Sequence, residues 1–257
     1  MSGDRDFDEL AGHFDSRIYG SPKGQIRLAI LKEDLQTCLP AAGSGISWRI
    51  LDAGCGQGQL SLWLASLGHQ LVLCDPSAQM LRRAEARFAE QTPQANVEFI
   101  QSDVQNLSTR LEGQFDLVML HAVLEWLAEP QCAFDYLLPF IKPAGLFSLL
   151  FYNRNSLVFR NLIRGNFRKV ASDDFRGHHG SLTPANPLAP QQVDTWISAA
   201  QLKPLLTSGV RVIYDYMNRE TAQQRSLPDL LEMERRVCRD ATYIPLARYI
   251  HVLASRG

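Results

Sequence analysis

Short apolar runs alternate with helical stretches along the first 153 residues of the chain. Five runs are predicted to be strands: RILDAG (49–54), QLVLCD (70–75), VEFIQSD (97–103), FDLVMLH (115–121) and LFSLLFYN (146–153). Residues with helical periodicity lie between them and predict helices at 57–67, 77–91 and 130–141. Apolar strands that alternate with helices are typical of a parallel sheet covered on both faces.

The two ends of the chain follow a different pattern. Two helices are predicted before the first strand, at 6–19 and 24–38, separated by Gly20 and Pro22. After Asn153 no clear strand is seen before the loop-forming sequence SLTPANPLAP. The remaining elements are predicted to be helices at 190–201 and 227–239 and strands at 203–216 and 247–255. These last two strands can pair antiparallel.

Together these elements predict an α/β, Rossmann-like fold with a seven-stranded, mostly parallel sheet and helices on both faces. We expect one domain over residues 1–257, since a chain of this length can bury one large core. It would comprise an N-terminal helical arm (1–45), a core (46–153) and a C-terminal half (154–257). Two insertions, at 154–189 and 217–246, are expected in that half.

Composition restricts the class of protein further. The apolar fraction of 46% and charged fraction of 21% are those of an ordinary globular protein. The five cysteines are odd in number and form no C-x-x-C pair, which argues against a disulfide framework or a zinc site. The start, MSGDRDFDEL, lacks the features of a signal peptide, and no apolar run is long enough to span a bilayer. We therefore expect a cytoplasmic protein with no bound metal and no membrane partner.

Charge is distributed unevenly along the chain. Residues 1–153 carry 11 Lys and Arg against 18 Asp and Glu, a net charge of −7. Residues 154–257 carry 15 against 9, a net charge of +6. This split is a hint of a polyanionic partner on the C-terminal side, although solvated faces of opposite sign would give the same counts.

The sequence LDAGCGQGQL (51–60) joins the first predicted strand to a helix, and it contains three glycines. Glycines allow a tight turn and a close approach of the backbone to a ligand, and the helix start offers free N–H groups. The dinucleotide motif needs G-x-G-x-x-G and the P-loop needs G-K-[ST], and neither is present. The loop therefore predicts a ligand site of another kind.

Acidic residues accompany this loop at the ends of successive strands. Asp52 precedes the glycines, Asp75 ends the second strand and Asp103 ends the third. An acid in the position of Asp75 can accept hydrogen bonds from both hydroxyls of a ribose, and one in the position of Asp103 can accept from an adenine amino group. Singly, each acid would more often be a surface carboxylate or a helix cap.

These motifs resemble those of the class I S-adenosylmethionine-dependent methyltransferases over about residues 49–153. LDAGCGQG is similar to the family's first motif, LCD to its ribose acid and QSDVQ to its adenine loop. The resemblance implies that 46–153 is a cofactor-binding core and that the cofactor is S-adenosyl-L-methionine. The loop contacts would come from Asp52, Gly54, Cys55 and Gly56, with Cys55 as a small spacer. His121, at a strand end in the same cleft, would contact either the methionine part or the acceptor.

The sequence indicates the molecule that accepts the methyl group less directly than it indicates the cofactor. HAVLEW (121–126) replaces the Asn-Pro-Pro-aromatic motif of many base amino-methyltransferases, and no cysteine follows a proline, as carbon-5 methylation typically requires. An anionic acceptor such as a carboxylate needs no base at neutral pH, so we expect no acid or base catalyst. It needs a cation in a desolvated pocket, and Arg211 and Arg248 lie in apolar, strand-like surroundings. A structural carboxylate such as Asp215 is the alternative partner of these arginines.

The segment YNRNSLVFRNLIRGNFRKV (152–170) combines basic and aromatic residues. Its cations are Arg154, Arg160, Arg164, Arg168 and Lys169. A helix would align residues 160, 164 and 168 on one face, as single-stranded RNA binding would favour. The alternative is an amphipathic lid, and we expect the interleaved aromatic residues to be mostly core.

Segments outside the cofactor motifs resemble one narrower family, the bacterial tRNA 5-carboxymethoxyuridine methyltransferases. They are RDFDELAGHFDSRIYGSPKGQIRLAIL, HAVLEW, LFYNRNSLVFRNLIRGNF, GVRVIYDY and ARYIHV. The resemblance implies methyl esterification of a wobble uridine, with the tRNA anticodon stem-loop as partner and 154–257 as the acceptor side. It also implies cofactor contacts at Arg27, Gly54, Asp75, Val104, Gln105 and His121. The alternatives are methylation of a small carboxylate or quinone precursor, and a cofactor-binding regulator without turnover.

Overall fold

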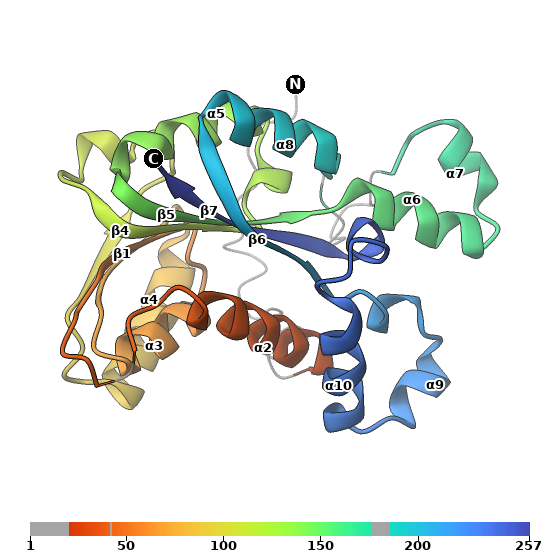
Figure 1. Cartoon of the computed structure of the whole chain (residues 1–257), viewed down its shortest axis with the longest axis horizontal. Coiled ribbons are helices and arrows are strands. Elements are labelled where there is room, and N and C mark those ends of the chain that lie inside the picture. Colours follow the sequence, from red (N-terminus) through yellow and green to blue (C-terminus); the bar gives the residue numbers. More distant parts are fainter. Residues whose placement is uncertain (1–20, 42, 176–183, 185) are drawn as a thin grey trace.

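The computed structural model describes residues 21–41, 43–175, 184 and 186–257. Within them, seven strands form one sheet in the order β3-β2-β1-β4-β5-β7-β6 (Figure 1). The strands are β1 (Arg49–Ala53), β2 (Gln70–Asp75), β3 (Val97–Gln101), β4 (Phe115–His121), β5 (Ile141–Tyr152), β6 (Leu202–Val210) and β7 (Tyr249–Arg256). This confirms the predicted fold class. The helix expected at 6–19 lies outside the described residues.

The strand directions determine where a ligand site can lie. β1 to β5 pair in parallel, whereas β7 runs antiparallel to both of its neighbours, β5 and β6. The chain winds outward from β1 toward β3 on one side and from β4 toward β5 on the other. In open α/β sheets, a crevice forms beyond the carboxyl ends of the two strands where the winding reverses. Here those strands are β1 and β4.

Helices cover both faces of the sheet. Figure 1 shows α5 (Pro130–Leu137) and α8 (Pro190–Ala199) on one face, and α2 (Pro22–Gln36), α3 (Gln59–Ser66) and α4 (Ala78–Gln91) on the other. The remaining helices are α6 (Arg154–Ile163), α7 (Phe167–Ala171), α9 (Arg219–Gln223) and α10 (Leu227–Val237). α6 and α7 follow β5 and project from the body of the molecule (Figure 1).

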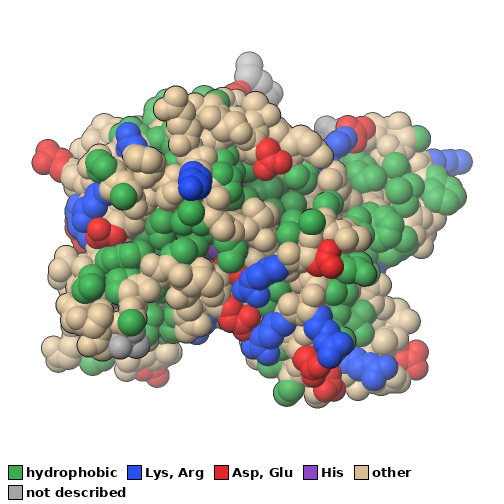
Figure 2. All heavy atoms as spheres, in the orientation of Figure 1, with side chains coloured by type: hydrophobic (Ala, Val, Ile, Leu, Met, Phe, Trp, Pro, Cys, Tyr) green, Lys and Arg blue, Asp and Glu red, His purple; other side chains and the backbone are tan. Residues whose placement is uncertain are grey.

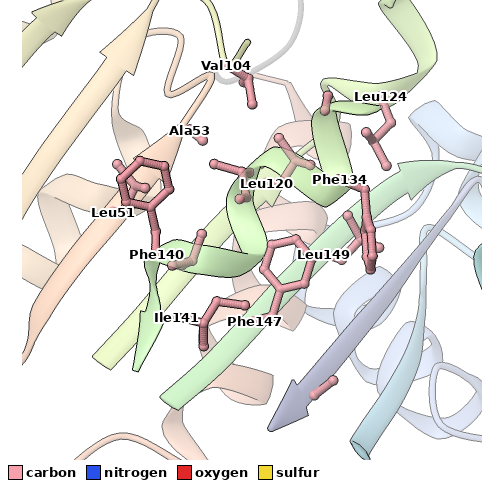
Figure 3. Close-up of a cluster of buried hydrophobic side chains, with 14 of the residues drawn as sticks. Leu51, Ala53, Val104, Leu120, Leu124, Phe134, Phe140, Ile141, Phe147 and Leu149 are labelled. Atoms are coloured by element: carbon pink, nitrogen blue, oxygen red, sulfur yellow. The ribbon is translucent and has the colours of Figure 1, made fainter. Parts of the chain in front are cut away.

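Two apolar layers hold the helices to the sheet. The layer beneath α5 and α8 contains Phe134 and Phe147, whose rings meet edge to face with centroids 5.3 Å apart (Figure 3). The opposite layer, beneath α2, α3 and α4, contains Ile30, Leu64 and Phe88. Because both faces of the central strands are covered, these strands are apolar on both sides, as their sequences predicted.

Most predicted bounds shift by one or two residues in the structure, and the departures are larger in two regions. The helix predicted at 130–141 ends at Leu137, and after a short 3₁₀ turn β5 begins at Ile141, five residues before the predicted strand. The strand predicted at 203–216 ends at Val210 because Arg211 takes a left-handed backbone conformation with φ of 61°. The 3₁₀ turn η6 (Tyr214–Tyr216) then replaces the end of the predicted strand.

Candidate active site

The glycine loop lies at the carboxyl end of β1 and is fixed to β2. The backbone N–H groups of Gly54 and Cys55 both donate to the Cys74 carbonyl oxygen, at 2.8 and 2.9 Å. Gly54 has a φ of 76°, and a Cβ added to it would lie 2.3 Å from Cγ2 of Val123. A larger residue is therefore excluded there. Burial raises the pKa of the Cys55 thiol well above its ordinary value, which fits a spacer and not a nucleophile.

Two carboxylates flank this loop. The oxygens of Asp75 accept hydrogen bonds from the Gly56 N–H at 2.8 Å and the Ser77 N–H at 2.9 Å. Asp52 accepts a hydrogen bond from the Ser61 hydroxyl at 2.5 Å. Burial raises the pKa of Asp52 to about 6, although the Ser61 hydrogen bond opposes this shift. Both carboxylates are thus positioned before any ligand arrives.

One cavity brings together most of the predicted cofactor residues. Its lining includes Arg27, Asp52, Gly54, Cys55, Gly56, Asp75 and His121. Apolar side chains, among them Leu31, Met80 and Trp126, complete its walls. The carboxylates can accept hydrogen bonds from the hydroxyl groups of a ligand, and apolar walls lie beside them. This combination suits a ligand in which a ribose is joined to an aromatic base and an aliphatic chain.

The predicted adenine loop lies outside this cavity. Asp103 lines a neighbouring hollow, and Pro76 lines both. The carboxylate of Asp103 accepts from the backbone N–H and side-chain amide of Asn106, at 2.9 and 3.0 Å, so it also caps the following turn. Val104 is buried in the apolar layer beneath α5. An adenine contact by Asp103, Val104 and Gln105 stays a prediction.

Glu125 is a candidate site residue that the sequence reasoning missed. It follows β4 in the 3₁₀ turn η4 (Leu124–Trp126), next to Trp126 of the cavity wall, and is completely buried. Neither of its carboxylate oxygens has a hydrogen-bond partner among the described residues. Burial raises its pKa to about 7, while the charge of Arg27 acts in the opposite direction. Its position within HAVLEW, directly after the strand that ends at His121, was the available signal in the sequence.

The two predicted acceptor arginines meet at one carboxylate. Nε of Arg211 donates to Oδ2 of Asp215 at 2.6 Å, and Nη2 of Arg248 lies 3.4 Å from Oδ1. Arg248 also donates to the Tyr152 hydroxyl at 2.6 Å. All three charged residues are buried. The structural carboxylate weighed as an alternative partner is therefore present.

Asp215 does not balance the positive charge around it. Lys23 lies 4.0 Å from Asp215, and the charges of Arg248 and Asp215 both act on half-buried Arg160. We call Lys23, Arg160, Arg211 and Arg248 the basic cluster. Burial would raise the pKa of Asp215, but Arg211, Arg248 and Lys23 lower it to about 2. The four cations of the cluster therefore outnumber the single carboxylate that they share.

A tyrosine connects the basic cluster to the cofactor cavity. The guanidinium carbon of Arg27 lies 5.1 Å from the centroid of the Tyr249 ring, and that of Arg211 lies 5.4 Å from it. Arg27 lines the cavity, so a single aromatic side chain lies between the cavity wall and the cluster. Glu234 of α10 fixes the loop that carries Arg211, because its carboxylate accepts the N–H groups of residues 212, 213 and 214.

The basic segment after β5 differs from its prediction in two ways. α6 ends at Ile163 and Gly165 takes a φ of 71°, so residues 160, 164 and 168 do not share one helix face. Arg168 and Lys169 belong to the separate helix α7. The expectation that the aromatic residues are core is right for buried Tyr152 and wrong for Phe167, which is 65% exposed.

The projecting lobe of α6 and α7 therefore presents both classes of side chain. Phe159, Leu162, Ile163 and Phe167 are exposed on it, and hydrophobic side chains cover much of its visible face (Figure 2). Arg164, Arg168 and Lys169 are exposed as well. Arg154 instead forms an ion pair with Asp173. Exposed aromatic and basic side chains together are typical of a surface that binds unpaired bases.

Comparison with known proteins decides the family. Residues 50–145 match the family described as "Methyltransferase domain". The tRNA 5-carboxymethoxyuridine methyltransferase of Escherichia coli (strain K12) is 40% identical over 253 residues, which cover 98% of this chain and 97% of that protein. The chain belongs to the tRNA 5-carboxymethoxyuridine methyltransferase family. Membership confirms the predicted enzyme class, an S-adenosylmethionine-dependent methyltransferase, and with it the predicted cofactor.

More distant relatives share the core and the fold. The ubiquinone biosynthesis O-methyltransferase of Xanthomonas campestris pv. campestris (strain B100) is 26% identical over 162 residues, 63% of this chain and 65% of that protein. Magnesium protoporphyrin IX methyltransferase from Synechocystis PCC 6803, with bound SAH, has a TM-score of 0.65 at 16% identity, over 98% of this chain and 96% of its own. The alignment with the Escherichia coli protein covers nearly the whole chain, so it includes most of the residues that follow the cofactor core.

Across residues 21–41, 43–175, 184 and 186–257, no group of three or more His, Cys, Asp or Glu side chains is arranged to hold a metal ion. Among the helices in that part of the chain, none is long and apolar enough to cross a membrane.

Proposed function

We propose that this enzyme esterifies the carboxymethoxy group of the wobble uridine in tRNA. The observation that supports this most is the basic cluster, which carries more positive charge than Asp215 balances and lies one tyrosine away from the cofactor cavity. A carboxylate is the anion that such a cluster of guanidinium groups binds well.

The cofactor residues fit S-adenosylmethionine and have separate tasks. When bound, the cofactor supplies a methyl group on a positively charged sulfur, which is a good leaving group. Asp75 would accept the ribose hydroxyls, and Arg27 would pair with the methionine carboxylate. The apolar walls formed by Leu31, Met80 and Trp126 would exclude water from the reacting atoms.

The acceptor needs orientation and not a base. A carboxylic acid is ionised at neutral pH, so one of its oxygens can attack the methyl carbon while the sulfur–carbon bond breaks. The products are an ester and a neutral thioether, and no proton is transferred. Arg211 would position the carboxylate, since its Nη1 and Nη2 have no partner among the described residues. Arg248 would keep Arg211 and Asp215 in place.

The α6–α7 lobe is proposed to bind the anticodon stem-loop. Arg164, Arg168 and Lys169 would contact phosphates, and Phe167 offers an exposed ring for stacking of an unpaired base. Arg160 is the residue of this lobe that adjoins the buried cations, because its charge interacts with both Arg164 and Arg248. The RNA backbone and the acceptor carboxylate would then be held by adjoining parts of one basic surface.

Nucleoside mass spectrometry tests the proposal. The purified protein and S-adenosylmethionine would be incubated with an anticodon stem-loop that carries 5-carboxymethoxyuridine, and with the same RNA carrying uridine. The methyl ester should form on the first RNA, and the second should not be methylated. If tRNA from cells that lack the protein keeps its methyl ester at full level, the proposed function is wrong. Methylation of a quinone precursor instead of the RNA would indicate a small-molecule acceptor.

A further inference from the structure

A chain of hydrogen-bonded side chains crosses the otherwise apolar layer between α2 and the sheet. Asp34 of α2 lies 2.8 Å from Nδ1 of His251, and Nε2 of His251 lies 2.8 Å from the Ser148 hydroxyl. The same hydroxyl lies 2.8 Å from Nε2 of His121 in the cofactor cavity. At its other end Asp34 pairs with Arg239, whose side chain is 38% exposed. We call Asp34, His251, Ser148 and His121 the histidine relay.

Three of the four relay side chains are polar groups without contact to solvent. Asp34, Ser148 and His251 have no exposed surface. They interrupt a layer formed by residues such as Leu31, Leu150 and Leu253. Burial of polar groups in such a layer is unfavourable unless each is hydrogen-bonded, and well-packed apolar residues would often be as stable. In the relay, the burial of these groups is offset because each side chain is hydrogen-bonded to the next.

The positions of the hydrogen atoms follow from counting charges. Burial would raise the pKa of Asp34, but the hydrogen bonds from His251 and Arg239 and the charge of Arg239 lower it, so Asp34 is ionised. Arg239 already balances this charge. A second cation on His251 would be uncompensated in a fully buried position, with His121 5.6 Å away between ring centroids. His251 is therefore neutral and donates its Nδ1–H to Asp34.

Each remaining hydrogen bond then has one direction. Nε2 of His251 carries no hydrogen, so it accepts the hydroxyl hydrogen of Ser148. The Ser148 oxygen must in turn accept from His121, which places a hydrogen on Nε2 of His121. Nδ1 of His121 is left with a lone pair and has no partner among the described residues.

We propose that Asp34, His251 and Ser148 are positioning residues that fix the tautomer of His121, so that Nδ1 accepts a hydrogen bond from the α-ammonium group of the cofactor. This assignment rests on the cofactor and is independent of the acceptor. The other end of the methionine moiety is a carboxylate, which Arg27 in the same cavity can bind. An imidazole fixed as an acceptor distinguishes the ammonium end from the carboxylate end, because a tautomer with Nδ1–H would favour the carboxylate.

Nitrogen NMR of the histidine side chains tests the tautomer directly. In the full-length protein with bound S-adenosylhomocysteine, His121 should show a protonated Nε2 and an unprotonated Nδ1. Assignment would use His121→Gln and His251→Gln. In Ser148→Ala, His121 should show a mixture of tautomers. A protonated Nδ1 of His121 in the unsubstituted protein would overturn the proposal.

Binding measurements test the consequence. Ser148→Ala should weaken binding of S-adenosylhomocysteine about tenfold, whereas binding of an analogue without the α-amino group should change less than about twofold. Ser208→Ala is the matched control, because buried Ser208 donates to Asp34 at 3.0 Å but does not link the histidines. It should change neither affinity. If Ser148→Ala weakens the binding of both ligands equally, the relay has a structural role only and the proposal is wrong. No measurement here involves tRNA, so failure of the proposed function would leave these results interpretable.

Discussion

The cofactor side and the acceptor side of this enzyme are built in different ways. The cofactor side is a short loop and two carboxylates at adjacent strand ends, and Asp75 is fixed by backbone N–H groups. The proposed acceptor side is assembled from side chains of distant elements: Lys23 lies in α2, Arg160 follows β5, and Arg211 and Arg248 flank the last two strands. A site made by a local loop can be recognised as a motif, whereas a site made by long-range contacts depends on the fold.

The largest effect is expected on the cofactor side. Asp75→Ala should lower the affinity for S-adenosylmethionine about 1000-fold, because hydrogen bonds to a charged group contribute about 1.5–3 kcal/mol each. Isothermal titration calorimetry would measure it. Asp103→Ala, outside the cavity, should lower the affinity about tenfold if Asp103 binds the adenine amino group. If Asp75→Ala leaves the affinity for S-adenosylmethionine unchanged, the cofactor does not bind in this cavity.

Glu125 lies where the two sides meet, since it interacts with Arg27 of the cavity and with Tyr249. Its pKa is raised from 4.5 to about 7 in the folded protein, so folding disfavours its ionised form. Ionisation in the unfolded chain then destabilises the native state increasingly as the pH rises from 4.5 to about 7, and the effect is constant above that. Glu125→Gln removes this penalty.

The variant should therefore be more stable than the unsubstituted protein at about pH 8, by up to about 3 kcal/mol, and nearly equal to it below about pH 4.5. Urea unfolding at several pH values would measure the difference. Glu129→Gln, at an exposed position nearby, changes the net charge equally and should show no such trend. A difference that stays constant with pH would contradict the assigned ionisation.

On the acceptor side, Arg211→Met should lower kcat/KM for tRNA about 100-fold and leave cofactor affinity unchanged. The substitution also removes one of the positive charges that balance the buried Asp215 carboxylate, which destabilises the fold. The double variant Arg211→Met/Asp215→Asn removes both charges and should recover stability but not activity. Recovery of activity as well would show that Arg211 serves only to neutralise Asp215.

The smallest effect is expected on the α6–α7 lobe. Arg164→Ala/Arg168→Ala should raise KM for tRNA about tenfold and lower the slope of log affinity against log salt by about 1 to 2. The matched control is Arg235→Ala/Arg236→Ala on α10, where both arginines pair with glutamates. If the control weakens tRNA binding equally, the lobe is not a specific RNA surface.

The difference between the two sides also explains what the sequence predicted. Alternating strands and helices, together with Asp52, the glycines and Asp75, determined the fold class and most of the cofactor cavity. The turn after Val210 was not predicted, because it depends on the left-handed conformation of Arg211 and on Glu234 from another element. The break after Ile163 had a local signal in Gly165 that the i, i+4 spacing of the arginines concealed. Glu125 and the histidine relay involve partners or cavities defined only by tertiary structure.

The position of β7 has a consequence for the order in which the protein can fold. β7 pairs with β5 on one side and β6 on the other, so β6 has no neighbour in the sheet until residues Tyr249–Arg256 are present. During synthesis, the cofactor loop and β1 to β5 emerge first and can pair in parallel. The loop after β6, with Arg211 and Asp215, and the His251–Asp34 contact must wait for that strand. On the ribosome, the cofactor side can therefore form early, whereas the acceptor side and the relay form together in a late step.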